Sequence, residues 1–342
     1  KVTLGADGGG KGITDAGSVI DVGVATRTKE DGTTETSAAQ GGKVTFRAGQ
    51  SAEIANKTDL NIQLSGAIRG ASDVSAEIVS AYTGTSLTSG NTSDQALGLT
   101  TISNDLNTLY SAANVTTLRG HLGFTDASYH VRPGIEITTP VGSTSDFTIG
   151  TGSPLATQDL NFNALRFADG AGGNTESGAL TIKATRDLLI GNTISDGFSQ
   201  ASTTAGFGAT GRDAKINGSG SSWSYRLVAG ADMTAANPVA VAPPPAAGAS
   251  EAGDPLGLKG SITVASGKLV RTGTGDITLA ARRDINLLDR AVVYTAGHDD
   301  TAPFYAASRT TGDPTFQRLG AGDIRAAGSR AYYHTGGGDL KI

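Results

Sequence analysis

Short runs in which apolar and polar residues alternate recur along the chain, and many of them follow a glycine. In the run GALTIKATRDLLI, the residues Leu180, Ile182 and Ala184 occupy every second position. A period of two places one set of side chains inward and the intervening Thr and Lys outward, so the pattern predicts half-buried β-strands. Similar runs begin at Gly42, Gly260, Gly275, Gly322 and Gly338, with weaker copies at Asp59–Ile68, Gly134–Thr139 and Asp146–Leu155.

The spacing of these runs predicts a repeat fold. Gly260 and Gly275 are 15 residues apart, and Gly322 and Gly338 are 16 apart. Such spacing is too short for a propeller blade and suits part or all of one coil of a parallel β-helix. We expect the glycine to supply the positive φ of a sharp turn. We expect the alanine that ends each first run to fit a corner that has no room for a larger side chain.

The expected architecture is all-β, with residues 1–342 forming one continuous shaft segment. If about 240 residues form coils of roughly 20 each, about a dozen coils would give a rod near 60 Å long. The chain opens with KVTL and closes with DLKI, both strand-like, so we expect both ends to lie inside a longer precursor. Exposed strand edges recruit partners, so further coils of the same chain or end-to-end copies are the expected neighbours.

Two charged pairs recur at one place in the repeat. TRDLLI and RRDINL place Asp187 and Asp284 at equivalent turn positions, and each is preceded by an arginine, Arg186 or Arg283. Asp suits such turns because its carboxylate accepts nearby backbone N–H groups. Stacked carboxylates repel one another, so our hypothesis is that these arginines screen a ladder of turns. The alternative is four ordinary solvated charges.

Two segments interrupt the repeat and are interpreted as inserts. Residues 73–118 contain Leu99, Ile102, Leu106, Leu109 and Tyr110 at helical spacing, which predicts a short helix, with a strand pair as the alternative. Ser93 or Asp94 is the expected N-cap. Residues 199–259 contain three consecutive prolines, which favours an extended surface loop. Trp223, the sole tryptophan, is expected to pack this second insert onto the shaft.

Composition narrows the class of protein. Glycine makes up 49 of 342 residues, charged residues 17% and aromatic residues 5%, which is typical of turns and thin strands. The chain has no cysteine, which excludes disulfides and cysteine metal sites. The 27 basic and 32 acidic residues form no long runs, so no nucleic-acid partner is expected. No run of 18 apolar residues occurs, so no membrane insertion is expected.

Candidate chemistry is sparse, and we expect no catalytic residue, cofactor or metal. GADGGGKG from Gly5 matches most of a phosphate-binding loop, but Gly12 replaces the Ser or Thr, and strand-like residues follow where a helix is needed. His298–Asp300 reads as a solvated loop, with a cation or acid–base site as the alternative. A sugar-stacking surface at Tyr332, Tyr333 and His334 is the one candidate ligand site, and core packing of the tyrosines is its alternative.

Three segments carry a resemblance to a known family. They are GALTIKATRDLLIGNTISDGF, SSWSYRLVAGADMTAANPVAV and GKLVRTGTGDITLAARRDINLLDRAVVYTAG, within residues 116–342. The chain here resembles the filamentous haemagglutinin-like exoproteins of Gram-negative bacteria, which are exported by two-partner secretion. The first 115 residues resemble them only loosely.

That resemblance implies a right-handed parallel β-helical shaft, secreted or held at the cell surface, with an outer-membrane transporter as its export partner. Its implied roles are attachment, aggregation or biofilm formation through glycans or proteins on host or neighbouring cells. The expected function is therefore a structural and adhesive shaft, not an enzyme. One alternative is a β-helical polysaccharide lyase or glycosidase, which would need a groove with clustered acids. The other is a stalk that displays a toxin domain for contact-dependent killing.

Overall fold

The computed structural model describes residues 2–6, 12–23, 26–36, 41–49, 62–90, 96–124, 126, 129–150, 159–170, 173–199, 215–216, 220–243, 259–301, 332–335 and 337–342. Within these ranges the chain is mostly β-structure, with two helices. The expectation of a β-rich chain is therefore confirmed.

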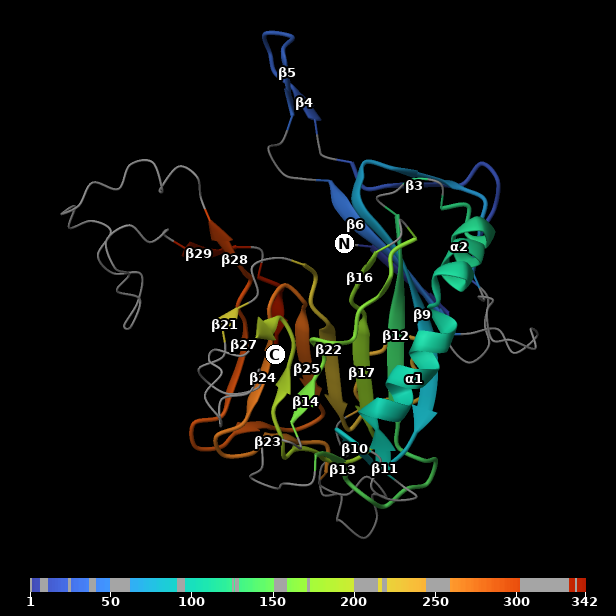
Figure 1. Cartoon of the computed structure of the whole chain (residues 1–342). Coiled ribbons are helices and arrows are strands. Elements are labelled where there is room, and N and C mark those ends of the chain that lie inside the picture. The colour runs from blue at the N-terminus through green and yellow to red at the C-terminus, as the bar shows by residue number, and fades with distance from the viewer. Residues whose placement is uncertain are drawn as a thin grey trace, which may run out of the picture.

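Three parallel sheets make up the body of the molecule (Figure 1). The eight-stranded sheet contains, in spatial order, β1 (Val2–Ala6), β6 (Gly42–Gly49), β9 (Ala71–Thr83), β12 (Tyr129–Thr138), β17 (Ala179–Ala184), β22 (Ser224–Ala229), β25 (Ile277–Ala281) and β30 (Leu340–Lys341). The six-stranded sheet contains β11 (Ala96–Gly98), β10 (Ser86–Thr88), β13 (Phe147–Ile149), β18 (Leu188–Ile190), β23 (Ile262–Val264) and β26 (Ile285–Leu287). The four-stranded sheet contains β14 (Leu160–Asn161), β19 (Ile194–Ser195), β24 (Leu269–Thr272) and β27 (Val292–Thr295).

The remaining strands form pairs. Two pairs are parallel: β2 (Gly12–Thr14) with β7 (Ile62–Leu64), and β3 (Val19–Asp21) with β8 (Ala67–Arg69). Four pairs are antiparallel: β4 (Thr26–Thr28) with β5 (Thr34–Thr36), β15 (Phe167–Ala168) with β16 (Asn174–Glu176), β20 (Phe198–Ser199) with β21 (Lys215–Ile216), and β28 (His298–Thr301) with β29 (Tyr332–Thr335). The β4–β5 hairpin projects from the body (Figure 1).

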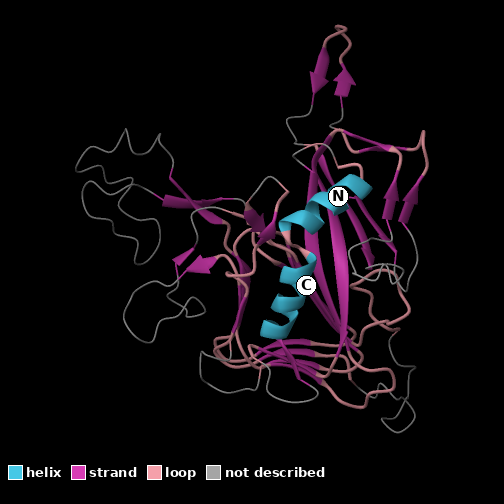
Figure 2. Cartoon of the chain, turned by 45° about the vertical axis from the view of Figure 1, so that its right-hand side comes forward, coloured by secondary structure: helices cyan, strands magenta, loops and turns pink. Residues whose placement is uncertain are grey.

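From β12 onward the chain visits the three sheets in a fixed order. It contributes β12, β13 and β14, then β17, β18 and β19, then β22, β23 and β24, then β25, β26 and β27. We call each such set of three strands a passage. Each strand pairs in parallel with its counterpart in the next passage. The six-stranded sheet crosses the base of the molecule in Figure 2, below the long strands of the eight-stranded sheet.

The passages are longer than the expected repeat of about 20 residues. Gly134 pairs with Ala179 and Ala179 with Ser224, which are steps of 45 residues. Gly260 and Gly275 precede strands of different sheets, so their 15-residue spacing separates two sides of the molecule and not two stacked strands. Eight strands about 4.8 Å apart span about 34 Å. The expectations of a dozen coils and a 60 Å rod are therefore wrong for this chain.

The core lies between the three sheets, and the predicted alternation is confirmed there. Leu180 and Ile182 of β17 are fully buried, and they pair in register with Tyr225 and Leu227 of β22, which are also fully buried. Burial of one such side chain stabilises the fold by about 1.5–3 kcal/mol. At the corner toward the six-stranded sheet, an alanine occupies each of three adjacent strands, as predicted: Ala184, Ala229 and Ala281.

The glycine before each strand has a different role from the one predicted. Gly178, Gly275 and Gly338 do not have positive φ. A Cβ added at Gly178 would lie 2.1 Å from the carbonyl oxygen of Pro133 on β12, and one at Gly338 would lie 2.0 Å from that of Gly275. Close approach of neighbouring backbones therefore excludes a side chain at these positions. Gly260 is the copy that does have positive φ, at 116°.

The predicted helix is confirmed as α1 (Leu99–Leu109), with Leu99, Ile102, Leu106 and Leu109 buried. Its N-cap is Gly98 rather than Ser93 or Asp94, both of which lie outside the described residues. A second helix, α2 (Ala112–His121), was not predicted, because it buries only Val115 and Leu118. Both helices lie alongside the long strands (Figure 2).

The two expected inserts contain strands of the main sheet. Residues 73–83 belong to β9, so the interruption predicted at 73–118 begins later than expected. The segment 199–259 contains β22, which is a central strand of the eight-stranded sheet. Its proline-rich part, 244–258, lies outside the described residues. Both ranges therefore mix inserted chain with repeat strands.

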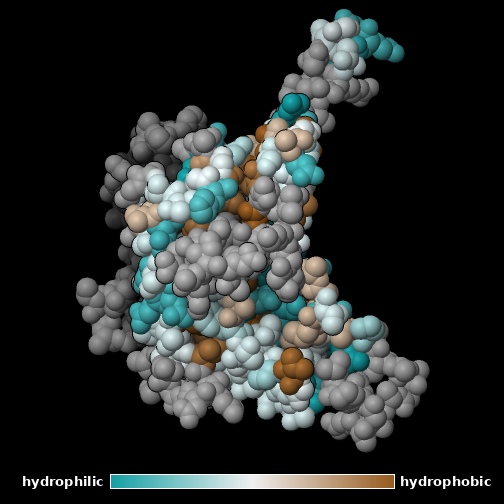
Figure 3. Space-filling view, turned by 90° about the vertical axis from the view of Figure 1, so that its right-hand side faces the viewer, coloured by the Kyte–Doolittle hydropathy of each residue, from teal (hydrophilic) through white to brown (hydrophobic). Residues whose placement is uncertain are grey.

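The surface on the side of the helices is mostly hydrophilic to neutral in Figure 3, with a hydrophobic strip below the β4–β5 hairpin. Leu4 of β1 and Val19 of β3 are exposed large apolar residues of the amino-terminal region. Neither described helix has the length and hydropathy needed to cross a membrane.

Candidate functional site

A groove on the outer face of the eight-stranded sheet is the best-formed candidate site. It has a volume of about 260 Å³, and its walls come from β6, β9 and β12 and from the segments that lead into β17, β22 and β25. We call it the polar groove. It is lined by Lys43, Thr45, Asp73, Ser75, Glu77, Arg132, Pro133, Ser177, Gly178, Ala179, Ser221, Ser222, Ser224, Arg226, Thr274, Gly275 and Asp276.

The alternation of the strands explains why charged residues gather here. Val44, Phe46 and Ala48 of β6 point into the core, so Thr45 and Arg47 between them point outward. Register then aligns outward residues of neighbouring strands. Arg47 pairs with Glu77 on β9, and Glu77 pairs with Arg132 on β12, so three charges form one row across the sheet.

Glu77 is the centre of the larger ion-pair cluster. Nη1 and Nη2 of Arg226 each donate to a Glu77 carboxylate oxygen over 2.8 Å, and Nε of Arg47 donates to Glu77 over 3.1 Å. Arg47 also pairs with Glu136. Burial alone would raise the pKa of Glu77, but Arg226 and Arg47 outweigh it and hold the pKa below its ordinary value. Glu77 is therefore ionised and doubly paired.

The Glu77–Arg226 pair requires a curved sheet. The two residues lie on β9 and β22, which β12 and β17 separate, so three strand spacings amount to about 14 Å in a flat sheet. Their direct contact means that the outer face is concave at this point. Gly134 on β12 lies under the pair, and a Cβ there would come within 2.9 Å of the Glu77 side chain. Glycine at this position leaves room for the ion pair.

A second cluster is built around Glu176 at one edge of the polar groove. Arg132 donates to Glu176 over 3.0 Å and to Asp73 over 3.4 Å, and His130 Nδ1 lies 2.5 Å from Glu176. Burial opposes ionisation of Glu176, but His130 and Arg132 together hold its pKa below the ordinary value. Asp73 Oδ1 is buried and has no hydrogen-bond partner among the described residues.

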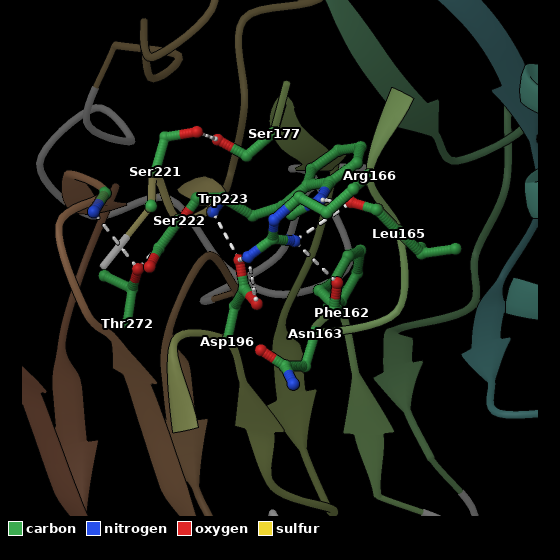
Figure 4. A network of polar contacts seen from close by, with 12 residues as sticks. Phe162, Asn163, Leu165, Arg166, Ser177, Asp196, Ser221, Ser222, Trp223 and Thr272 are labelled. Atoms are coloured by element: carbon green, nitrogen blue, oxygen red, sulfur yellow. Dashed lines mark hydrogen bonds and ion pairs between the residues drawn. The ribbon is translucent and has the colours of Figure 1, made fainter. Parts of the chain in front are cut away.

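Hydroxyl groups line the opposite side, where three strands begin. Ser177 donates to Ser221 over 2.9 Å, as Figure 4 shows. Thr274 Oγ1 accepts the backbone N–H of Ser222 over 2.9 Å, and Ser224 Oγ accepts that of Asp276 over 3.0 Å. These bonds fix the hydroxyls of adjacent strands relative to one another.

A buried carboxylate holds the adjoining core together. Asp196 is fully buried and accepts two hydrogen bonds of 3.0 Å from Arg166 and one of 2.6 Å from the backbone N–H of Trp223 (Figure 4). Burial raises the pKa of Asp196, and Arg166 opposes that rise. The Trp223 indole donates to the carbonyl of Leu165 over 2.9 Å. The cluster joins three successive passages and has a structural role.

Trp223 packs differently from expectation. It is fully buried at the start of β22, with its ring 5.2 Å from Phe162 and 6.4 Å from Phe167. It therefore packs between passages in the core and does not join the second insert to the outside of the shaft.

The predicted turn pairs lie on the six-stranded sheet in a different arrangement. Asp187 and Asp284 hold equivalent positions, but Ser261 stands between them. The stacked neighbour of Asp187 is Asp146, because Phe147 pairs with Leu188. Asp187 accepts the backbone N–H groups of Gly260 and Ser261, as expected for a turn aspartate.

Two cations neutralise the Asp146–Asp187 stack. Arg186 donates to Asp146 over 3.2 Å, and Lys259 Nζ lies 3.0 Å from Asp187 and 3.6 Å from Asp146. Burial raises the pKa of Asp187, but hydrogen bonds from Ser261 and Gly260 and the charge of Lys259 bring it below the ordinary value. Arg283 and Asp284 are exposed on a neighbouring strand. An arginine does accompany stacked carboxylates, although its partner is Asp146 and not the aspartate that follows it.

The predicted ligand surface meets the other histidine motif in one hairpin. Tyr332, Tyr333 and His334 belong to β29, which pairs with β28, so that Asp299 stands opposite His334 and Asp300 opposite Tyr333. Two motifs that the sequence separates by more than 30 residues are therefore neighbours along the backbone. Their side chains lie outside the described residues.

The other chemical expectations concern small motifs. Gly12–Thr14 forms β2, so a strand stands where a phosphate-binding loop needs a helix. Within the described ranges, no group of three or more His, Asp or Glu residues is arranged to hold a metal ion.

Sequence reasoning missed the polar groove, although a signal for it was present. Arg47, Glu77, Arg132 and Glu136 each interrupt an apolar strand at an outward position. Charged residues at such positions indicate a polar outer face. The pairing of Glu77 with Arg226 could not be predicted, because it joins residues 149 positions apart across two intervening strands.

Comparison with protein-family models, curated proteins and solved structures finds no match to this chain.

Proposed function

We propose that the chain is a segment of a right-handed parallel β-helix that serves as the structural and adhesive shaft of a secreted, filamentous haemagglutinin-like protein. The observation that supports the fold is the order of strands, since four successive passages give one strand each to the same three parallel sheets. In a β-helix every coil does this, and each strand stacks on its counterpart.

The same order suits a load-bearing shaft. Each strand hydrogen-bonds to the preceding and following passages, so the backbone bonds run along the stacking direction. Asp196 and Glu77 add polar ties between passages. Segments between strands project outward, which is where solenoid proteins carry their binding surfaces.

The charge state of the groove favours a shaft over a hydrolase. Glycosidases need one carboxylic acid with a raised pKa beside a second carboxylate. In the polar groove Glu77 is paired with two arginines, Glu176 at its edge is paired with an arginine and a histidine, and both have lowered pKa values. These carboxylates are poor proton donors, which supports a non-enzymatic role.

Attachment, aggregation or biofilm formation, export through an outer-membrane transporter and a cell-surface location belong to the same proposal. They are supported by the three segments within residues 116–342 that resemble the exoproteins. Glycans or proteins of host or neighbouring cells are the proposed partners.

Electron cryo-microscopy of the natively secreted protein that contains this chain tests the proposal. We expect unbranched rods with an axial repeat near 4.8 Å. A strain whose exoprotein lacks this chain should bind less to surfaces or to neighbouring cells than a strain with the complete protein. A compact particle that releases reducing ends from polysaccharides would contradict the proposal and favour a carbohydrate-active enzyme.

A further inference from the structure

We propose that the polar groove binds an uncharged saccharide unit of a cell-surface or matrix polysaccharide. This inference rests on the proposed function, because it names the ligand class that an extracellular attachment segment would recognise at this site.

The charges of the lining cancel. Three cationic side chains, Lys43, Arg132 and Arg226, face three carboxylates, Asp73, Glu77 and Asp276. A groove for an anionic ligand such as a phosphate or a uronate would have a cationic excess, and a groove for a cation would have an acidic excess. Neutral balance favours an uncharged polar ligand.

The hydrogen-bonding groups of the groove suit a ligand with many hydroxyls. Asp73 Oδ1 is a buried acceptor without a donor among the described residues, and the exposed amine of Lys43 stands opposite Asp73 in register. The hydroxyls of Ser177, Ser221 and Ser224 line the facing wall. A sugar hydroxyl both donates and accepts, so one unit can satisfy the carboxylate, the amine and the serines together.

The groove is held in shape before any ligand enters. Both nitrogens of the Arg226 fork are bound to Glu77, and Arg132 is bound to Glu176. Side chains that are already ordered lose little conformational entropy when a ligand binds. Its volume of about 260 Å³ is just below the usual range of roughly 300–1,000 Å³ for drug-sized ligands and suits about one or two sugar rings.

No residue of the lining is aromatic, so the stacking contact that strengthens many sugar sites is missing among the described residues of the groove. We therefore expect weak binding at a single site, with a dissociation constant on the order of 1 mM. Avidity from many copies along a surface would make such a site effective.

Saturation-transfer NMR on the chain tests the inference, with cellotriose, maltotriose and chitotriose as neutral probes and trigalacturonate and inorganic phosphate as anionic probes. We expect saturable binding of at least one neutral probe. Asp73→Asn, which replaces one acceptor oxygen by an amide, and Ser221→Ala should each weaken it at least about fivefold. Asp289→Asn, at an exposed turn aspartate paired only with Arg290, is the matched control and should leave binding unchanged.

Ser221→Ala removes one surface hydroxyl and keeps the ion pairs, so it remains informative if Asp73→Asn fails to fold. Binding of anionic probes alone, no saturable binding, or equal effects of the groove and control variants would overturn the inference. Rod-shaped particles without saccharide binding would reject this inference and retain the shaft. Saccharide binding by a compact particle would do the reverse.

Discussion

Two ion-pair clusters of similar composition stand in different surroundings. In the groove cluster, the side chains of Arg47, Glu77 and Arg226 are 2%, 6% and 19% exposed. In the corner cluster on the six-stranded sheet, Asp146 is 41% exposed and Lys259 is 29% exposed. Water screens the second cluster and is excluded from the first. The comparison teaches that burial, not the number of pairs, decides what an ion pair contributes.

Removal of Glu77 should produce the largest effect. Glu77→Ala leaves Arg47 and Arg226 buried, close together and without their shared counterion. Breaking a buried pair in this way costs about 3–5 kcal/mol of unfolding free energy. Denaturant unfolding of both proteins measures it. Asp146→Ala in the corner cluster is the matched control and should cost no more than about 1 kcal/mol. Equal losses at the two sites would contradict the comparison.

Backbone crowding gives a second contrast within the eight-stranded sheet. Gly178→Ala would place a methyl group 2.1 Å from the Pro133 carbonyl, so the strands must separate. Overpacking of this kind costs about 1–3 kcal/mol. Gly49→Ala, where nothing lies within 4 Å of the added Cβ, should be nearly neutral. Thermal unfolding of the two variants checks this. A neutral Gly178→Ala would mean that the glycine is not needed for strand spacing.

The strands were the most predictable part of this fold. Leu180 and Ile182 alternate in the sequence because the sheet has a buried face and a polar face, and that alternation is local information. The helix at Leu99–Leu109 was predictable for the same reason, since its apolar residues follow one period. The second helix lacks that signal, because Thr and Asn fill most of its surface.

The stacking order was less predictable, because it depends on which glycines end up side by side. Gly260 and Gly275 look alike in sequence but begin strands of two different sheets. The groove depends on contacts between distant residues, such as Glu77 with Arg226, which no local pattern encodes. The turn hypothesis placed an arginine beside stacked carboxylates, yet the partner of Arg186 is Asp146, 40 residues earlier.

Acid should weaken the groove cluster in a graded way. The folded-state pKa values of Glu77 and Glu176 lie below the ordinary value of 4.5, so their contribution to stability is complete above that pH. It is lost as the pH falls through the folded-state values, because the native carboxylates then take up protons. Unfolding free energy measured from pH 7 to pH 3 should fall mainly below about pH 4.5. Glu77→Gln should show a shallower fall, whereas an identical slope would rule out Glu77 as a main contributor.

Arg186→Gln should have the smallest effect and tests the corner cluster directly. The variant loses the pair with Asp146, but Lys259 still lies near both Asp146 and Asp187, so part of the repulsion between the carboxylates remains compensated. We expect a loss of at most about 1 kcal/mol at low salt, which shrinks as salt screens the exposed charges. Arg283→Gln is the matched control, because Ser261 and not a carboxylate occupies the strand beside Asp284. Thermal unfolding at two salt concentrations separates the variants. Equal, salt-independent losses would mean that these arginines act by packing, since screening by an arginine requires a stacked pair of carboxylates and only Arg186 has one beside it.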